Sequence, residues 1–254
     1  MNDLMLEMSR FDQPEPKDIG GERAEYQHEG IPLVGVTTAL SMVNLFLGKW
    51  ANELGRKGVS LDYYLTNTAN LGKLVHLFVG EKLTNLPIEN CPDFQPYWEP
   101  ARQIAKKFDD FLSDYRIELI ASERPLINHK AGFGGTLDIL ANIFHRNCRI
   151  RALADVKTST GIFETHKMQG AAYRNLCDFN NIPIDKVLFI SLSRDLTKPY
   201  KVSVLNQEEY YEKRFFCFLR AYQQNELQKK ARKEADHKLN LKNNRLLLKE
   251  LKCK

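Results

Sequence analysis

Hydrophobic positions change their spacing near the middle of the chain. Before Ile117 they recur at helical intervals, which predicts one helix over roughly 62–84 and another over 97–115. The apolar face of the second helix consists of Ile104, Phe108, Phe111 and Leu112. After Ile117 the pattern becomes a series of short apolar runs separated by polar turns. The first half is therefore predicted to be mostly helical, and the second half to be built around a sheet.

The second half predicts the order β-β-β-α-β-β-α. The three opening runs read IELIAS, GTLDILANIF and RIRALADVKTS, and the polar connector HRNC between the last two indicates a hairpin. A helix is expected over 165–179 and a long one from near Gln207. Between these helices, two further strands are expected in KVLFISLSR and YKVSVL. This arrangement is typical of an α/β or α+β domain with a mixed sheet flanked by helices.

The segment IPLVGVTTAL, residues 31–40, precedes the first long helix. It begins as a strand-like run and is expected to pass through Thr37 or Thr38 into a helical stretch that includes Phe46 and Trp50. Either threonine could cap the helix, because a hydroxyl oxygen accepts from the free N–H groups of a first turn.

Length and composition favour one catalytic-sized domain inside the cell. A chain of 254 residues with 43% hydrophobic residues can fill one sizeable core. The five cysteines are scattered without a C-x-x-C pair, which argues against a disulfide framework and for a reducing compartment. No stretch approaches the roughly 18 apolar residues of a membrane span, and the N-terminus does not resemble a signal peptide. We therefore expect an intracellular, cytoplasmic protein without a membrane partner.

The positive charge is concentrated at the C-terminus. The net charge is +5, and residues 224–254 hold 10 Lys and Arg against 4 Asp and Glu. This segment is either a helix with a leucine face or a disordered basic arm. We divide the chain into a loose lead-in (1–24), one domain (25–223, helical over 25–116 and sheet-based over 117–223) and the basic tail (224–254).

Two acidic residues and a lysine lie in the predicted strands. Asp155 and Lys157 share one face of a strand, while Ala154 and Val156 share the other. A hairpin turn near 145–148 would bring Asp138 close to Asp155. Two neighbouring carboxylates repel each other unless a divalent cation neutralises them, and hard oxygen ligands favour Mg²⁺ or Mn²⁺.

This pattern indicates phosphodiester hydrolysis, with structural alternatives. Lys157 could orient or help deprotonate an attacking water and stabilise the charge that develops on phosphorus. Alternatively, Asp155 and Lys157 form a plain ion pair on one strand face, and Asp138 is a turn or cap residue. The motifs that accompany them favour the catalytic interpretation.

Four motifs occur in one order along the chain: LGKLVHLF (Gly72 and His76), GTLD (Gly135 to Asp138), DVK (Asp155 to Lys157) and QGAAY (Gln169 and Tyr173). Together they resemble the RecB-like exonuclease branch of the PD-(D/E)xK nuclease superfamily. The resemblance covers roughly residues 24–215. Within this branch, the chain is similar to phage, bacterial and mitochondrial genome maintenance exonucleases. It implies a restriction-endonuclease-like core.

The resemblance also implies roles for individual residues. Asp138, Asp155 and the carbonyl of Val156 would be metal ligands, His76 would complete the shell, and Lys157 would be the catalytic lysine. The alternative for His76 is a histidine packed between helices.

Four further residues follow from the same resemblance. Glu123 occupies the place of an acidic residue on the first core strand, although Glu118 lies on that strand too. Gln169 and Tyr173, spaced i and i+4 on one helix face, would contact the strand end and a substrate phosphate. Gly72, one turn before His76, would leave room for backbone or substrate.

The expected function is a metal-dependent deoxyribonuclease, acting as an exonuclease on single-stranded DNA ends in replication, recombination or repair. The chain lacks the cysteine cluster of iron–sulfur relatives and has no G-x-x-x-x-G-K-[ST] loop, so neither that cofactor nor a motor is expected. An endonuclease in defence or recombination, or a silent nucleic-acid-binding module, remains an alternative.

The tail could add a second contact with nucleic acid. Lys229, Lys230, Arg232 and Lys233 could hold DNA outside the cleft, which predicts a salt-sensitive affinity. The alternative is a solvated end whose charge aids solubility.

Overall fold

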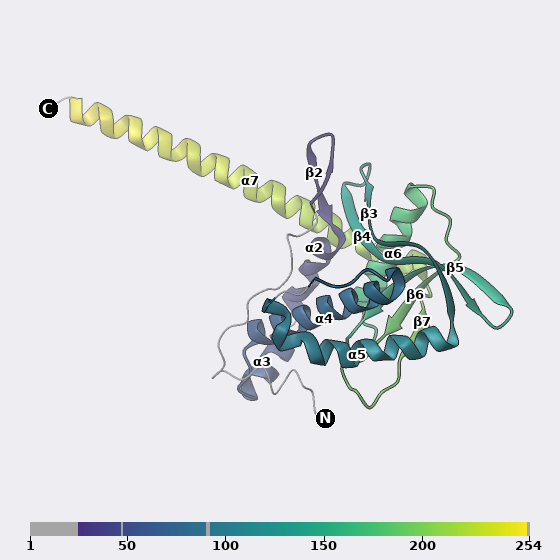
Figure 1. Ribbon diagram of the computed structural model, residues 1–254. Coiled ribbons are helices and arrows are strands. Elements are labelled where there is room, and N and C mark those ends of the chain that lie inside the picture. The colour runs from purple at the N-terminus through teal and green to yellow at the C-terminus, as the bar shows by residue number, and fades with distance from the viewer. Residues whose placement is uncertain (1–24, 47, 90–91, 253–254) are drawn as a thin grey trace.

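A seven-stranded mixed sheet forms the centre of the protein (Figure 1). The computed structural model describes residues 25–46, 48–89 and 92–252, except for the side chains at 44–46, at 49 and from 239 onward. The expected lead-in, 1–24, lies outside the described residues. The strands are β1 (Tyr26–His28), β2 (Ile31–Gly35), β3 (Arg116–Asn128), β4 (Phe133–His145), β5 (Cys148–Lys157), β6 (Lys186–Ser191) and β7 (Lys201–Val204).

The strand order is β1-β2-β4-β5-β6-β7, and β3 also pairs with β4. The pairs β2–β4 and β5–β6 are parallel, whereas the others are antiparallel. The predicted hairpin is confirmed, because His145 pairs with Cys148 and Arg146 between them has φ +52°. The order of elements expected after Ile117 is confirmed as well.

Helices cover both faces of the sheet (Figure 1). On one face lie α4 (Leu61–Thr84) and α5 (Gln95–Asp114); on the other lie α2 (Val36–Leu40), α6 (Glu164–Phe179) and the first turns of α7 (Glu208–Lys252). The remaining helical elements are η1 (Ser41–Phe46), α3 (Gly48–Arg56) and η2 (Pro92–Phe94). The expected class, a mixed sheet flanked by helices with a helical N-terminal half, is confirmed.

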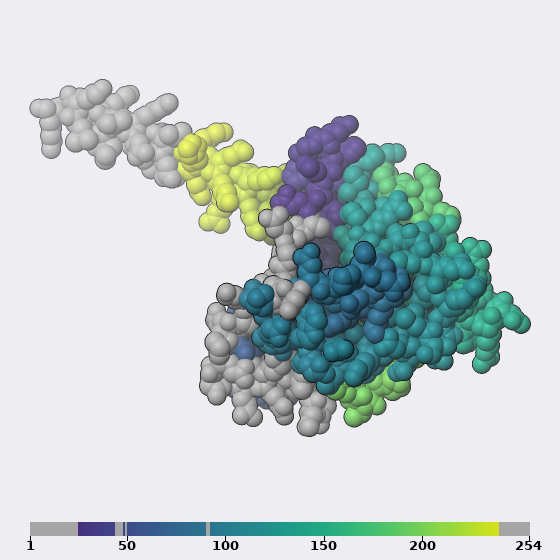
Figure 2. All heavy atoms as spheres, viewed as in Figure 1, coloured from purple at the N-terminus to yellow at the C-terminus, as the bar shows by residue number. Residues whose placement is uncertain are grey.

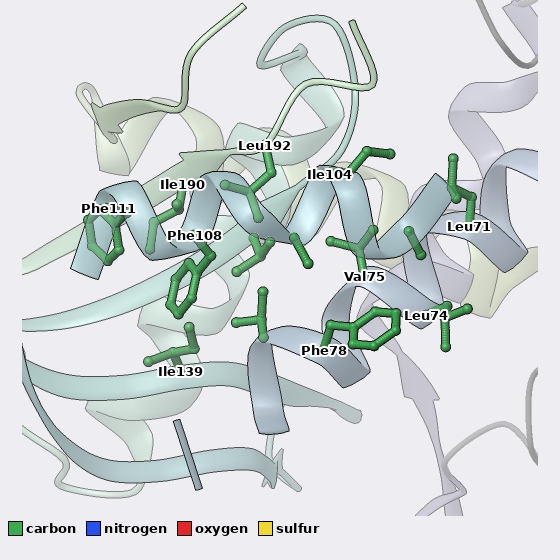
Figure 3. Packing of buried hydrophobic residues seen from close by; sticks show 14 of the residues in the cluster. Leu71, Leu74, Val75, Phe78, Ile104, Phe108, Phe111, Ile139, Ile190 and Leu192 are labelled. Atoms are coloured by element: carbon green, nitrogen blue, oxygen red, sulfur yellow. The ribbon is translucent and has the colours of Figure 1, made fainter. Parts of the chain in front are cut away.

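The core between α4, α5 and the sheet follows from the helical spacing (Figure 3). Apolar side chains of both helices interdigitate with those of β4, of β6 and of the residue just after β6. The labelled members of this core are Leu71, Leu74, Val75, Phe78, Ile104, Phe108, Phe111, Ile139, Ile190 and Leu192. This packing fixes the rotation of α4, so that Gly72 and His76 are left on the side that faces the end of β5.

The predicted capping of the first helix is wrong. Helix α2 begins at Val36, its N-cap is Gly35, and no side chain caps it. Val36, Ala39 and Leu40 are buried, so the chain turns into the helix directly after β2 to place these side chains in the core. Burial therefore outweighs the capping preference of a threonine.

A short hairpin precedes this helix and was missed. β1 pairs with β2 through a tight turn in which Glu29 and Gly30 both have positive φ, at 50° and 77°. Such a turn matches the right-handed twist of the two strands. The residues of β1, Tyr-Gln-His, carry no apolar alternation from which a strand could be predicted.

Helix α7 extends far beyond the sheet (Figures 1 and 2). Its first turns are anchored by the buried side chains of Tyr211, Phe215 and Leu219. From Leu227 to Lys238 every side chain is exposed, and Figure 2 shows this part standing clear of the body. Of the two alternatives for the tail, the structure has the helix, through Lys252, while most of the leucines of its expected apolar face lie beyond 238, where side chains are not described. Among the described helices, none has the length and apolar character that crossing a membrane requires.

Candidate metal and active site

The candidate site lies where β4 and β5 separate. The last pair of their ladder is Ile139 with Ala154, and β2 pairs with β4 only at Phe133 and Gly134. Asp138 and Asp155 are the next residues on the two strands, so they face each other across this opening. The proximity expected from the hairpin register is thus confirmed.

Side chains replace the strand partner that Val156 lacks on this edge. Its backbone N–H donates to Asp138 Oδ2 at 3.0 Å, and its carbonyl oxygen accepts from His76 Nε2 at 3.0 Å. A buried backbone without such partners would be strongly destabilising. His76 on α4 and Asp138 on β4 are therefore held against β5 by the backbone itself.

Three side chains converge beside this edge. His76, Glu123 and Asp138 each offer a ligand atom, and these atoms lie within 4.8 Å of one another. His76 Nδ1 lies 3.5 Å from Asp138 Oδ2. Because a carbonyl oxygen can only accept, Nε2 of His76 carries the proton that bonds Val156, and the lone pair of Nδ1 faces the carboxylate. A cation between these atoms would turn that repulsion into attraction.

Glu123 reaches the group through an irregular backbone. It has φ +48°, and it is skipped in the ladder between the pairs Ser122–Ile139 and Arg124–Leu137. A positive φ at a glutamate is strained, and such strain concentrates at functional sites. The alternative acid, Glu118, is exposed and forms an ion pair with Arg116 instead, 3.3 Å away.

The carboxyl groups of the site bind protons more tightly than free ones. Burial raises the pKa of Asp155 to about 7, although Lys157 opposes the shift. Burial also raises the pKa of Asp138. Glu123 is exposed on its outer side, yet loss of hydration, followed by the charges of Asp138 and Asp155, raises its pKa to about 7. Each of these carboxylates would be stabilised by a cation.

His76 has the opposite shift, which suits a ligand. Burial first, then the charge of Lys157, lowers its pKa to about 4, so the ring is neutral at physiological pH. A neutral imidazole keeps one nitrogen lone pair for a metal. Two carboxylates and one imidazole with a carbonyl close by form an oxygen-rich set that fits a divalent cation such as Mg²⁺ or Mn²⁺.

A polar chain extends from Asp155 along β5 and α6. Lys157 Nζ lies 2.7 Å from Asp155 Oδ2 and donates to Gln169 Oε1 at 3.0 Å. Gln169 Nε2 in turn donates to the hydroxyl oxygen of Tyr173 at 2.8 Å. Asp155 is only 1% exposed, and among the described residues neither of its oxygens accepts a well-aligned hydrogen bond. Its charge is therefore balanced chiefly by the ammonium group of Lys157.

Gly135 explains how α6 comes so close to β4. A Cβ at this position would lie 2.6 Å from a ring carbon of Tyr173 and 3.1 Å from Val36. Only glycine lets the buried tyrosine ring lie directly on the strand. A Cβ at Gly72, in contrast, would meet only Thr158 Oγ1 at an ordinary 3.5 Å, so packing within the protein does not require that glycine.

Tyr26 of the missed hairpin lies on the adjoining part of β4. Its hydroxyl is 2.9 Å from Thr136 Oγ1, and a Cβ at Gly134 would lie 2.5 Å from its ring. The glycine pair before Thr136 was the one signal in the sequence for such a close approach. Nothing in the pattern indicated which side chain covers it.

The start of α6 is fastened to α7. Glu164 accepts from Lys167, from Tyr211 and from Arg214. His166 Nδ1 accepts from the N–H of Phe163, and burial followed by the charge of Lys157 lowers the pKa of His166 to about 3. These contacts fix the helix that carries Gln169 and Tyr173.

The residues expected at the site thus lie together in space. His76, Glu123 and Asp138 form the convergent group, with the carbonyl of Val156 bonded to His76. Asp155 is adjacent to Asp138 but lies outside that group and pairs with Lys157. A cation held by this convergent group would have His76, Glu123 and Asp138 as its nearest side chains, with Asp155 beside them.

Comparison with known proteins adds little to this description. No protein-family model and no curated protein matches the chain. Among solved structures, a candidate exonuclease from Eubacterium rectale is 8% identical, with 74% of this chain and 77% of that chain covered and a TM-score of 0.41. The protein SSO0001 is 16% identical, with 55% and 80% covered and a TM-score of 0.21. At such low scores, neither likeness supports a conclusion.

Proposed function

We propose that the protein is a divalent-cation-dependent nuclease that hydrolyses phosphodiester bonds in DNA, working as an exonuclease on single-stranded ends. The observation that carries the proposal is the convergence of His76, Glu123 and Asp138 beside the Asp155–Lys157 pair. The motif order in the sequence supports the same assignment.

His76 would bind the cation through Nδ1, with Glu123 and Asp138 as oxygen ligands. The bond from Nε2 to the carbonyl of Val156 holds the ring in the required tautomer, as second partners of metal-binding histidines commonly do. The other lone pair of that carbonyl, together with Asp155, completes the proposed set. The bound cation would supply charge neutralisation at the scissile phosphate and a lowered pKa for a water at the site.

Lys157 would act on the attacking water. Its ammonium group, held by Asp155 and Gln169, would donate to a water and orient it, its positive charge would favour the loss of a proton from that water, and it would stabilise charge on a phosphate oxygen. Gln169 fixes the position of Lys157 and is itself fixed by Tyr173. Gln169 and Tyr173 would therefore position Lys157 and contact the end of β5.

The first test is cleavage of circular and linear DNA, single- and double-stranded, with Mg²⁺ or Mn²⁺. The proposal expects cleavage of linear single strands from their ends and no cleavage of circles. Cutting of circles would indicate an endonuclease. Binding without cleavage by the wild-type protein, under every metal condition, would leave a silent nucleic-acid-binding module.

Asp155→Asn tests the site itself. Loss of this carboxylate should reduce the cleavage rate by about a hundredfold or more, since it removes several kcal/mol of transition-state stabilisation. Glu118→Gln is the matched control, because Glu118 is exposed and pairs only with Arg116. Equal rates for both variants would contradict the assignment.

A further inference from the structure

Arg194 lies next to the candidate site but outside the motifs. It follows β6, and its backbone N–H donates to the carbonyl of Thr158, one residue beyond Lys157, at 3.2 Å. Its guanidinium turns toward α4, where Nη1 donates to Thr68 Oγ1 at 2.9 Å and Nη2 to the hydroxyl of Tyr64 at 3.4 Å. The group also faces the ring of Tyr64, 5.8 Å from its centroid.

No described carboxylate neutralises this cation. Among the residues that the structure describes, no Asp or Glu oxygen forms an ion pair with Arg194, and its Nε is buried without a hydrogen-bond partner. The neighbouring Asp195 pairs with Lys198 and bonds Thr197 instead. A half-buried guanidinium held only by two hydroxyls retains donors for an anion.

Three contacts lie one turn apart along α4, and Arg194 makes the first of them. His76 contacts Val156 O; one turn earlier Gly72 faces Thr158; and one turn before that Thr68 holds Arg194. Thr68 and His76 are eight positions apart, which corresponds to about 12 Å of helix axis. Since stacked phosphates follow one another at about 3.4 Å along a strand axis, and farther apart when the strand is stretched, this span covers a few nucleotides.

We propose that Arg194, oriented by Thr68 and Tyr64, is a second phosphate subsite, which holds the strand a few nucleotides from the bond being cut. This proposal rests on the proposed function. The helix face at Gly72, where a Cβ would meet only Thr158 Oγ1 at an ordinary 3.5 Å, is where the sugar-phosphate backbone passes from one subsite to the other. The ligand is a single-stranded nucleic acid, and the contact is with phosphate, so it carries no base preference.

The test is the salt dependence of binding to a single-stranded oligonucleotide of 12 nucleotides, measured in the Lys157→Ala background so that the strand stays intact. Each neutralised phosphate on a single strand contributes about −0.7 to the slope of log K against log salt concentration. Arg194→Gln should lower the magnitude of this slope by about 0.7 and weaken binding about tenfold at low salt. Arg149→Gln is the control, because Arg149 is an exposed arginine at the opposite end of β5 that bonds Asn142.

A purely structural role of Arg194 is distinguished by a second variant. Thr68→Glu leaves Arg194 in place but sets a carboxylate beside its guanidinium, so the link between α4 and the loop persists while the charge is neutralised. The proposal expects the same loss of slope in this variant, with an unchanged melting temperature. A wild-type slope in Thr68→Glu, or in folded Arg194→Gln, overturns the subsite.

Substrate length separates this proposal from the proposed function. Bis(4-nitrophenyl) phosphate carries one phosphodiester and cannot reach Arg194, so the Arg194→Gln enzyme should hydrolyse it with Mn²⁺ at the wild-type rate. Its kcat/KM on the 12-nucleotide strand should fall about tenfold. Equal losses on both substrates refute the subsite, whereas absence of wild-type hydrolysis of any phosphodiester refutes the nuclease itself.

Discussion

At the scale of single residues, the site is assembled around an edge of backbone rather than around a pocket of side chains. The N–H and carbonyl of Val156 would be left without partners where β4 and β5 part, and Asp138 and His76 supply them. Each of these two side chains therefore satisfies the backbone and offers a remaining atom to a cation. Substitution of either would disturb local structure as well as metal binding, which makes Glu123 the cleaner residue to test.

Glu123→Gln should make the metal-free protein more stable above pH 7 and leave it unchanged near pH 4. The folded-state pKa of Glu123 is raised to about 7, so from about pH 4.5 upward the unfolded chain loses this proton first and stability falls until the folded group has ionised. The glutamine variant lacks this loss. Thermal unfolding with a chelator, at pH 4 and at pH 8, measures the difference.

The same variant should respond less to metal. At pH 8, Mg²⁺ or Mn²⁺ should raise the melting temperature of the wild-type protein more than that of Glu123→Gln, because binding to the folded state stabilises it. Identical metal-induced shifts in both proteins would exclude Glu123 from the metal shell. Glu118→Gln again serves as the control.

Sequence reasoning identified most of the clustered residues but could not see Arg194. His76, Asp138, Asp155 and Lys157 belong to a set of spaced motifs, so their proximity could be expected from the order of elements. Arg194 belongs to no motif, and its contacts with α4 join residues more than 120 positions apart. Such a contact depends on how a helix packs on a sheet, which local pattern does not encode.

At the scale of elements, strands were predictable where alternation or an apolar run marked them. β4 and β5 were marked by apolar runs, and the period-two geometry of a strand placed Asp155 and Lys157 on one face. β3 was recognised only up to Ser122, whereas it continues to Asn128 through a bulge near Ile120 and the irregular Glu123. These irregularities break the alternation from which its length could have been judged.

The glycines of two elements predict a matched pair of variants. Gly135→Ala should destabilise the protein by about 1–3 kcal/mol or more, since the added methyl group would collide with Tyr173 and Val36 in a packed core. Gly72→Ala should leave the melting temperature unchanged or raise it slightly, because its methyl group meets only an ordinary contact and alanine is favoured over glycine inside a helix.

Gly72→Ala should impair activity without impairing stability. If the backbone of the substrate passes Gly72, then Gly72→Ala should raise KM for single strands although the fold is intact. Chemical denaturation and steady-state kinetics on both variants provide the comparison. A large loss of stability in Gly72→Ala would mean that packing, not substrate, requires this glycine.

At the scale of the whole molecule, α7 has two parts with different physical roles. Tyr211, Phe215 and Leu219 pack into the core, whereas the side chains from Leu227 to Lys238 are all exposed. A helix without tertiary packing contributes little to folding stability. Its Lys and Arg residues would matter for binding instead, as the tail hypothesis proposes.

Truncation after Gln224 should therefore change the melting temperature by no more than about 2 °C, while Phe215→Ala should cost about 3–5 kcal/mol. If the tail holds DNA, the truncated protein should also show weaker and less salt-dependent binding. Binding with an unchanged salt slope would favour the alternative of a solvated end.

The parallel pairing of β2 with β4 constrains how the protein can be made. Val34 meets Phe133, a partner synthesised about 100 residues later, and closing so long a loop is slow. The N-terminal hairpin must therefore wait, unpaired with the sheet, while its receiving strand emerges from the ribosome. That pairing borders the opening that holds Asp138 and Asp155, so the candidate site can be assembled only after β4 and then β5, which is synthesised later still, have joined the sheet.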